Sequence, residues 1–219
     1  MTSFSKLKDS ITLENEDLSI PGSTMVLSGF LAFMGIITAE VLYPGYSTLQ
    51  DISDLGSTRP PNPVIMEPSA TIFNSTMILT GALIMISAFF IYRRMERHRF
   101  PLALAIFGFG AFGVGVFPGN MTPWHGLFAL LTFFSGGITV ILSSRTVTRP
   151  FSLICGLLGT VSLLMLMSAI LYGVTGISHP LSFLGMGGIE RWVVYPLILW
   201  TLAYGGYISG SSIKNENKL

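Results

Sequence analysis

Residues 150–173, PFSLICGLLGTVSLLMLMSAILYG, decide the fold of this chain. They contain no Asp, Glu, Lys or Arg, and as a helix they are long enough to cross a hydrocarbon core of about 30 Å. A lipid environment offers no hydrogen-bonding partners to an open backbone, so an apolar run of this length must satisfy its own backbone as a helix. The stretch therefore predicts a membrane-spanning helix.

Five further apolar stretches of similar character lie before and after this one. They are found at about 22–44, 70–92, 100–117, 123–143 and 190–210. The sequence thus predicts an all-α polytopic membrane protein, a bundle of six transmembrane helices over residues 22–210. We expect polar cytoplasmic tails at 1–21 and 211–219, and one sizeable outer loop at 45–69.

The composition agrees with this class. The chain of 219 residues is 50% hydrophobic and only 11% charged, against roughly 25% charged residues in soluble domains. A net charge of +1 leaves no basic surface for a nucleic acid. The single cysteine, Cys155, excludes an intramolecular disulfide and a cysteine metal cluster.

The cations predict the orientation of the bundle. With the six spans above, the basic residues at one end outnumber those at the other, which are only Arg59 and Arg191. The larger group comprises Lys6, Lys8, Arg93, Arg94, Arg97, Arg99, Arg145, Arg149, Lys214 and Lys218. Because cytoplasmic loops carry the excess of Lys and Arg, we expect both termini on the cytoplasmic side of the cell (plasma) membrane.

The remaining polar residues gather at the opposite, outer boundary. They are Glu40, Asn74, His125, Glu190 and Arg191. Glu40 falls in the last turn of the first span, where both the hydrocarbon and the negative end of the helix dipole disfavour a carboxylate. It therefore requires a cation, a proton or a bound ligand.

Two interpretations of this group stay open. In the first, each residue caps a helix or sits near lipid headgroups. In the second, the residues share a polar pocket under the 45–69 loop, with Arg191 or Arg59 neutralising Glu40. Asp51, Ser53 and Asp54 join them if the loop folds over the bundle.

The sequence contains no recognisable catalytic motif, so whether it is an enzyme stays uncertain. His125 is the candidate proton carrier, and a triad of Ser53, His125 and Asp54 has no spacing that supports it. We expect neither a metal nor a cofactor, because the outer histidines are too few for zinc. The string Gly108–Gly113 matches a dinucleotide fingerprint, but inside a span it indicates close helix packing.

The outer residues also carry a resemblance. Ile52-Ser53-Asp54-Leu55-Gly56, Pro63 through Phe73-Asn74, and Gly115-Val116-Phe117-Pro118 with His125 resemble the prokaryotic six-span family catalogued as domain of unknown function 998. Glu190-Arg191 fits it as well. The resemblance implies six helices and no established activity. The family is similar in plan to the Frag–DRAM–Sfk membrane proteins, which implies a lipid-facing role by analogy.

Three functions follow as hypotheses. In the first, an outward-opening pocket binds, or binds and modifies, a membrane lipid or other amphiphile, with Arg191 as the headgroup-phosphate contact. The second is a non-enzymatic subunit or scaffold that packs against a membrane-protein partner, or a second copy, through the glycine-rich third span. The third is a small proton-coupled transporter that uses Glu40.

Overall fold

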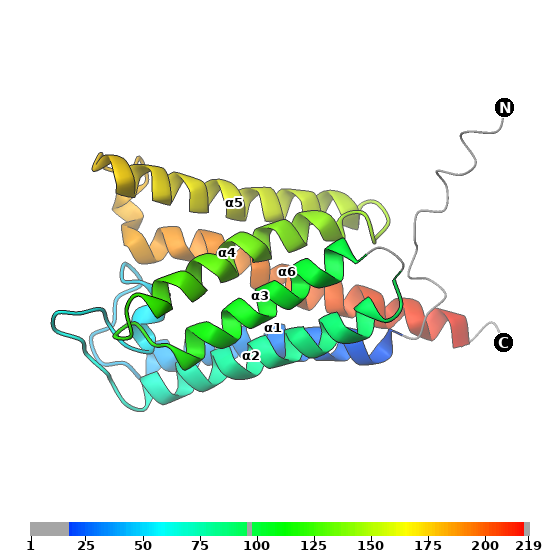
Figure 1. The fold of residues 1–219 in the computed structure, drawn as a ribbon, viewed down its shortest axis with the longest axis horizontal. Helices are drawn as coiled ribbons and strands as arrows, with labels where there is room; N and C mark the ends of the chain where they lie inside the picture. Colours follow the sequence, from blue (N-terminus) through cyan, green and yellow to red (C-terminus); the bar gives the residue numbers. More distant parts are fainter. Residues whose placement is uncertain (1–17, 96–97, 217–219) are drawn as a thin grey trace.

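The structure is a computed structural model that describes residues 18–95 and 98–216. Within these ranges the chain forms six α-helices and no strands (Figure 1). The helices are α1 (Ser19–Val41), α2 (Ser69–Tyr92), α3 (Arg99–Val116), α4 (Trp124–Ser143), α5 (Phe151–Thr175) and α6 (Gly185–Glu216). Two short 3-10 helices, η2 (Ile52–Leu55) and η3 (Ser182–Leu184), lie in loops. Most of the predicted N-terminal tail, with Lys6 and Lys8, together with Arg97 and Lys218, lies outside the described residues.

The all-α prediction and the membrane class are confirmed. Helices α1 to α5 are each long and apolar enough to cross a membrane. Helix α6 is not in this group, because Trp, Tyr and Pro196 lower its mean hydropathy. Pro196 lies inside α6, and since proline has no amide hydrogen, the carbonyl of Trp192 has no helical donor.

The helices form a closed ring in which each helix packs against its neighbours in the chain. Helix α6 packs against both α5 and α1, which closes the ring. Successive helices run in opposite directions, so α1 begins and α6 ends at the same end of the bundle (Figure 1). The loop of residues 42–68 covers the other end (Figure 1). Large apolar side chains such as Phe30, Phe89 and Leu157 cover the outside of the ring, which suits contact with lipid.

The glycines of α3 allow its neighbours to approach closely. A Cβ on Gly108 would lie 2.8 Å from the carbonyl oxygen of Gly81 in α2, and a Cβ on Gly110 would lie 2.8 Å from the amide nitrogen of Thr132 in α4. The interpretation of this string as a helix-packing surface is confirmed. The same contacts cover these glycines inside the chain, so they do not offer a surface to a partner.

We predict that Gly110→Ala lowers the melting temperature of the protein in detergent. The added methyl group would have to displace backbone atoms of α4, and overpacking of this kind costs about 1–3 kcal/mol. Circular dichroism at increasing temperature measures the effect.

Gly156→Ala is the matched control. A Cβ at Gly156 meets no atom within 4 Å, and alanine favours a helix over glycine, so the melting temperature should stay level or rise. Equal melting temperatures for the two variants would contradict the packing role of Gly110.

Candidate functional site

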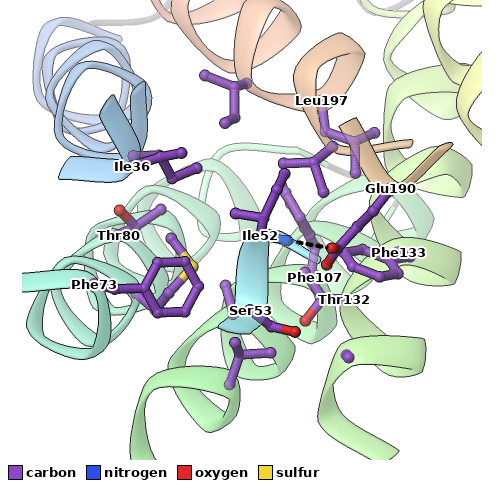
Figure 2. Close-up of a pocket in the computed structure, with 17 residues that line it drawn as sticks. Ile36, Ile52, Ser53, Phe73, Thr80, Phe107, Thr132, Phe133, Glu190 and Leu197 are labelled. Atoms are coloured by element: carbon purple, nitrogen blue, oxygen red, sulfur yellow. Dashed lines mark hydrogen bonds between the residues drawn. The ribbon is translucent and has the colours of Figure 1, made fainter. Parts of the chain in front are cut away.

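A pocket lies inside the ring at the end covered by the 42–68 loop (Figure 2). It is a cavity of about 70 Å³, whereas a single water needs only about 10–15 Å³. Helices α1, α2, α3, α4 and α6 contribute its walls, and η2 contributes its roof. The lining residues are Ala32, Ile36, Ile52, Ser53, Phe73, Met77, Thr80, Phe107, Ala111, Val114, Ala129, Thr132, Phe133, Glu190, Val194, Leu197 and Ile198.

Glu190 supplies the only charge in this lining. Its Oε2 accepts a hydrogen bond of 2.6 Å from the backbone amide of Ile52 in the roof (Figure 2). Among the described residues, no cation lies within ion-pair distance of this carboxylate. A carboxylate held at an apolar cavity with one hydrogen bond is costly, so this position favours a further donor.

The roof is fixed by polar contacts to α2. Ser69 donates a hydrogen bond of 3.2 Å to the carbonyl of Leu55, and Asn74 Nδ2 donates one of 3.4 Å to the carbonyl of Gly56. Ile52 and Leu55 of η2 are buried, with only 3% and 0% of their surface exposed. Because apolar side chains of the loop belong to the core, η2 is part of the bundle.

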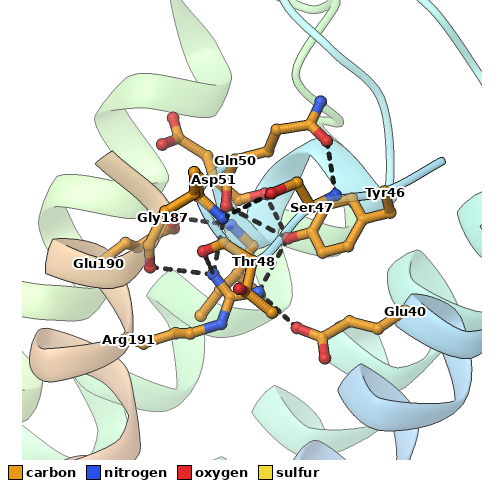
Figure 3. A network of polar contacts seen from close by, with 11 residues as sticks. Glu40, Tyr46, Ser47, Thr48, Gln50, Asp51, Gly187, Glu190 and Arg191 are labelled. Atoms are coloured by element: carbon orange, nitrogen blue, oxygen red, sulfur yellow. Dashed lines mark hydrogen bonds and ion pairs between the residues drawn. The ribbon is translucent and has the colours of Figure 1, made fainter. Parts of the chain in front are cut away.

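Arg191, the residue after Glu190, ties the loop to two helices (Figure 3). Its Nη2 donates to Glu40 at the end of α1, and this ion pair has only 11% and 19% side-chain exposure. Its Nη1 donates to the carbonyls of Thr48, Gln50 and Gly187 at 2.9, 3.2 and 2.9 Å. The structure thus assigns the neutralisation of Glu40 to Arg191.

Tyr46 completes this cluster from the loop. Its hydroxyl accepts a hydrogen bond of 3.0 Å from Arg191 and donates one of 2.9 Å to the carbonyl of Asp51. Burial raises the pKa of Tyr46 to about 12, so the phenol stays neutral and keeps its donor. We name the set Glu40, Tyr46 and Arg191 the latch.

The other outer cation has a different role. Arg59 pairs with Asp51 at 2.8 Å, but its side chain is 60% exposed. Asp54 in η2 has no side-chain ion pair among the described residues; its pKa is raised mainly by burial and then by the charge of Asp51. Arg59 therefore stays at the surface of the loop.

Residues 185–188, Gly-Met-Gly-Gly, come just before the span predicted at about 190–210. They form the first turn of α6, which begins at Gly185 and not near residue 190. The loop backbone lies directly against them, because the amide of Gly187 donates a hydrogen bond of 3.0 Å to the carbonyl of Leu49. A Cβ at Gly187 would overlap the carbonyl of Gln50, so glycine is required for this close approach.

His125 ties the start of α4 to the end of α3. Its Nδ1 donates a hydrogen bond of 2.8 Å to the carbonyl of Phe117, so in the neutral ring Nε2 is an acceptor. His125 is 2% exposed, and Nε2 has no partner among the described residues, as is also true of Asn74 Oδ1. Since Nδ1 contacts a backbone carbonyl, no carboxylate orients this ring and the Ser53–His125–Asp54 triad does not form.

The seven residues expected around one ligand thus divide into three groups. Ser53 and Glu190 line the pocket; Glu40 and Arg191 form the latch above it; Asn74, Asp54 and His125 lie outside the lining. Both terminal nitrogens of Arg191, which the sequence suggested as a phosphate contact, donate to protein acceptors. Tyr46, Thr80 and Thr132 were not expected at the site, because the sequence does not show which way an aromatic or hydroxyl side chain faces.

We predict that Arg191→Met exposes the loop to proteases. The substitution leaves Glu40 without its cation, and breaking a largely buried pair in this way costs about 3–5 kcal/mol. Chymotrypsin, which cleaves after Tyr and Leu, should cut within the 42–68 loop much faster than in the unmodified protein. Glu40→Gln combined with Arg191→Met should recover part of the loss, because no unpaired carboxylate remains.

Arg59→Met is the matched control at the same end of the bundle. An exposed pair contributes about 0–1 kcal/mol, so its cleavage rate should be nearly unchanged. If Arg191→Met and Arg59→Met were cleaved alike, the latch would not hold the loop.

Comparison with known proteins supports the resemblance of the outer motifs. No curated protein and no solved structure matches this chain. The model of one family, described as a protein of unknown function (DUF998), matches residues 26–207. This match covers all six described helices except the first residues of α1 and the last residues of α6, so the chain belongs to the DUF998 family.

Proposed function

We propose that this protein binds a membrane lipid or other amphiphile in the pocket beneath η2. The hydrocarbon part would lie among the apolar walls, and the polar end would lie at Glu190 and Ser53. The observation that carries the proposal is the composition of the lining. It is apolar except for the hydroxyl groups of Ser53, Thr80 and Thr132 and the carboxylate of Glu190. Pockets for small ligands combine apolar walls with a few placed polar groups in this manner.

The proposal includes six membrane crossings. Helix α6 packs between α1 and α5, two helices that are apolar enough to span, so it would cross the same hydrocarbon layer. The positive-inside rule then puts Arg93, Arg94, Arg145 and Arg149 on the cytoplasmic side, at the plasma membrane of a prokaryotic cell, and the pocket end outside.

The residues on which the two other hypotheses depend are already engaged within the chain. Gly110 and Gly108 contact α4 and α2 of the same chain, so a scaffold role would need another surface. Glu40 is paired with Arg191, so a transporter that protonates Glu40 would first have to break the latch. Amphiphile binding is the function that uses the described cavity.

The test is the lipid content of the purified protein. Ala129→Phe places a large side chain into the cavity from α4, since Ala129 is part of the lining. We expect native mass spectrometry to detect a bound amphiphile on the unmodified protein, and its occupancy to fall by at least about tenfold in Ala129→Phe, the equivalent of about 1.4 kcal/mol.

Ala203→Phe is the matched control, because Ala203 is an exposed residue of α6. It adds the same bulk to the lipid-facing surface and should leave the occupancy unchanged. Equal occupancy in all three proteins would show that the lipid binds to the outside of the ring and would reject the pocket.

A further inference from the structure

We propose that the pocket selects amphiphiles whose head group donates hydrogen bonds, an amine or a hydroxyl, and rejects phosphate and carboxylate heads. This inference rests on the proposed function and adds the chemical class of the ligand. It follows from the polar groups around the cavity: some still have a hydrogen to donate or a lone pair to accept, and others are already engaged by the protein.

Glu190 is the first of these groups. It presents a carboxylate to the cavity, and the protein supplies only the amide of Ile52 to one of its oxygens. The second oxygen has no protein donor among the described residues. In its ionised form, which a donor head such as an ammonium would stabilise, this carboxylate only accepts hydrogen bonds, and an anionic head beside it would be repelled in a pocket of low polarity.

The hydroxyl groups of the two threonines in the lining have already used their hydrogens. Thr80 donates to the carbonyl of Ser28 at 3.4 Å, and Thr132 donates to the carbonyl of Phe128 at 2.7 Å. Each hydroxyl oxygen therefore keeps only acceptor capacity toward a ligand. Among the polar side chains of the described lining, Ser53 alone has a hydroxyl hydrogen without a protein acceptor.

The cation that would attract a phosphate is not free. Both terminal nitrogens of Arg191 donate to Glu40, Tyr46 and backbone carbonyls. Arg191 is also absent from the lining. A phosphate that recruited this guanidinium would have to dismantle the latch, so the pocket has three acceptor groups and no available cation for an anionic head.

The test compares four probes that share one octyl chain and differ in the head: octylamine, octanol, octanoate and octyl phosphate. Equilibrium dialysis measures their binding to the full chain in phosphatidylcholine nanodiscs. The amount bound by Ala129→Phe in identical nanodiscs is subtracted, which removes partition into the bilayer. We expect the amine and the alcohol to bind at least about tenfold more tightly than the two anions, since hydrogen bonds to charged groups contribute about 1.5–3 kcal/mol.

Glu190→Gln separates the contribution of the charge. Glutamine keeps a carbonyl oxygen for the amide of Ile52, so the roof should stay in place and chymotrypsin should cleave the loop no faster. Octylamine binding should weaken by about tenfold or more, while octanol binding should change less. A larger effect on the amine identifies a cationic ligand; an equal loss for both probes identifies a hydroxyl ligand.

The outcomes distinguish this inference from the function on which it rests. If none of the four probes binds above the Ala129→Phe background, the proposed amphiphile pocket is wrong. If octyl phosphate or octanoate binds as tightly as octylamine, or if Glu190→Gln leaves the amine affinity unchanged, the pocket stands and its assignment to donor heads is overturned.

Discussion

The contact between Arg191 and Glu40 is the interaction on which the outer end of this molecule depends. Glu40 lies at the end of α1, where the helix dipole and the hydrocarbon both oppose a negative charge. Arg191 neutralises it, and because a guanidinium has more donors than one carboxylate can use, the same side chain also binds carbonyls of Thr48 and Gln50. The path of the loop thus follows from the need to surround a largely buried cation with hydrogen-bond acceptors.

The pocket is a consequence of this arrangement. The ring of helices leaves a space where α1, α2, α3, α4 and α6 face one another, and it would open directly to the exterior if the loop were absent. The latch brings η2 over this space, and Ile52 and Ser53 become the roof. Glycines in α3 and in the first turn of α6 contribute by close approach, since they let a helix or a loop come nearer than any side chain would allow.

The helices follow from the sequence because length and scarcity of charge determine them directly, although the start of α6 at Gly185 does not. Glu40 and His125, for example, were placed correctly at helix ends, because the apolar stretches 22–44 and 123–143 end and begin near them. Which way a side chain faces is a different matter, because it depends on the rotation of each helix about its axis. Asn74 and His125 were therefore grouped with Glu190 around a ligand, although they lie outside the lining. The contact of Leu49 and Gln50 with the glycines of α6 joins segments far apart in the chain, and no local pattern announces it.

Pro196 interrupts the hydrogen bonding of the helix that carries Glu190 and Arg191. Glu190 and Arg191 are consecutive, so they point about 100° apart on one helix. Glu190 lines the cavity (Figure 2), and Arg191 contacts the loop (Figure 3). Less than two turns later, Pro196 removes a hydrogen bond from the helix. The segment from Gly185 to Tyr195 carries both side chains on one helix, so any displacement of this segment would move them together. Pulling Arg191 from Glu40 would swing Glu190 as well, so release of the cover and loss of the anchoring carboxylate would be a single motion.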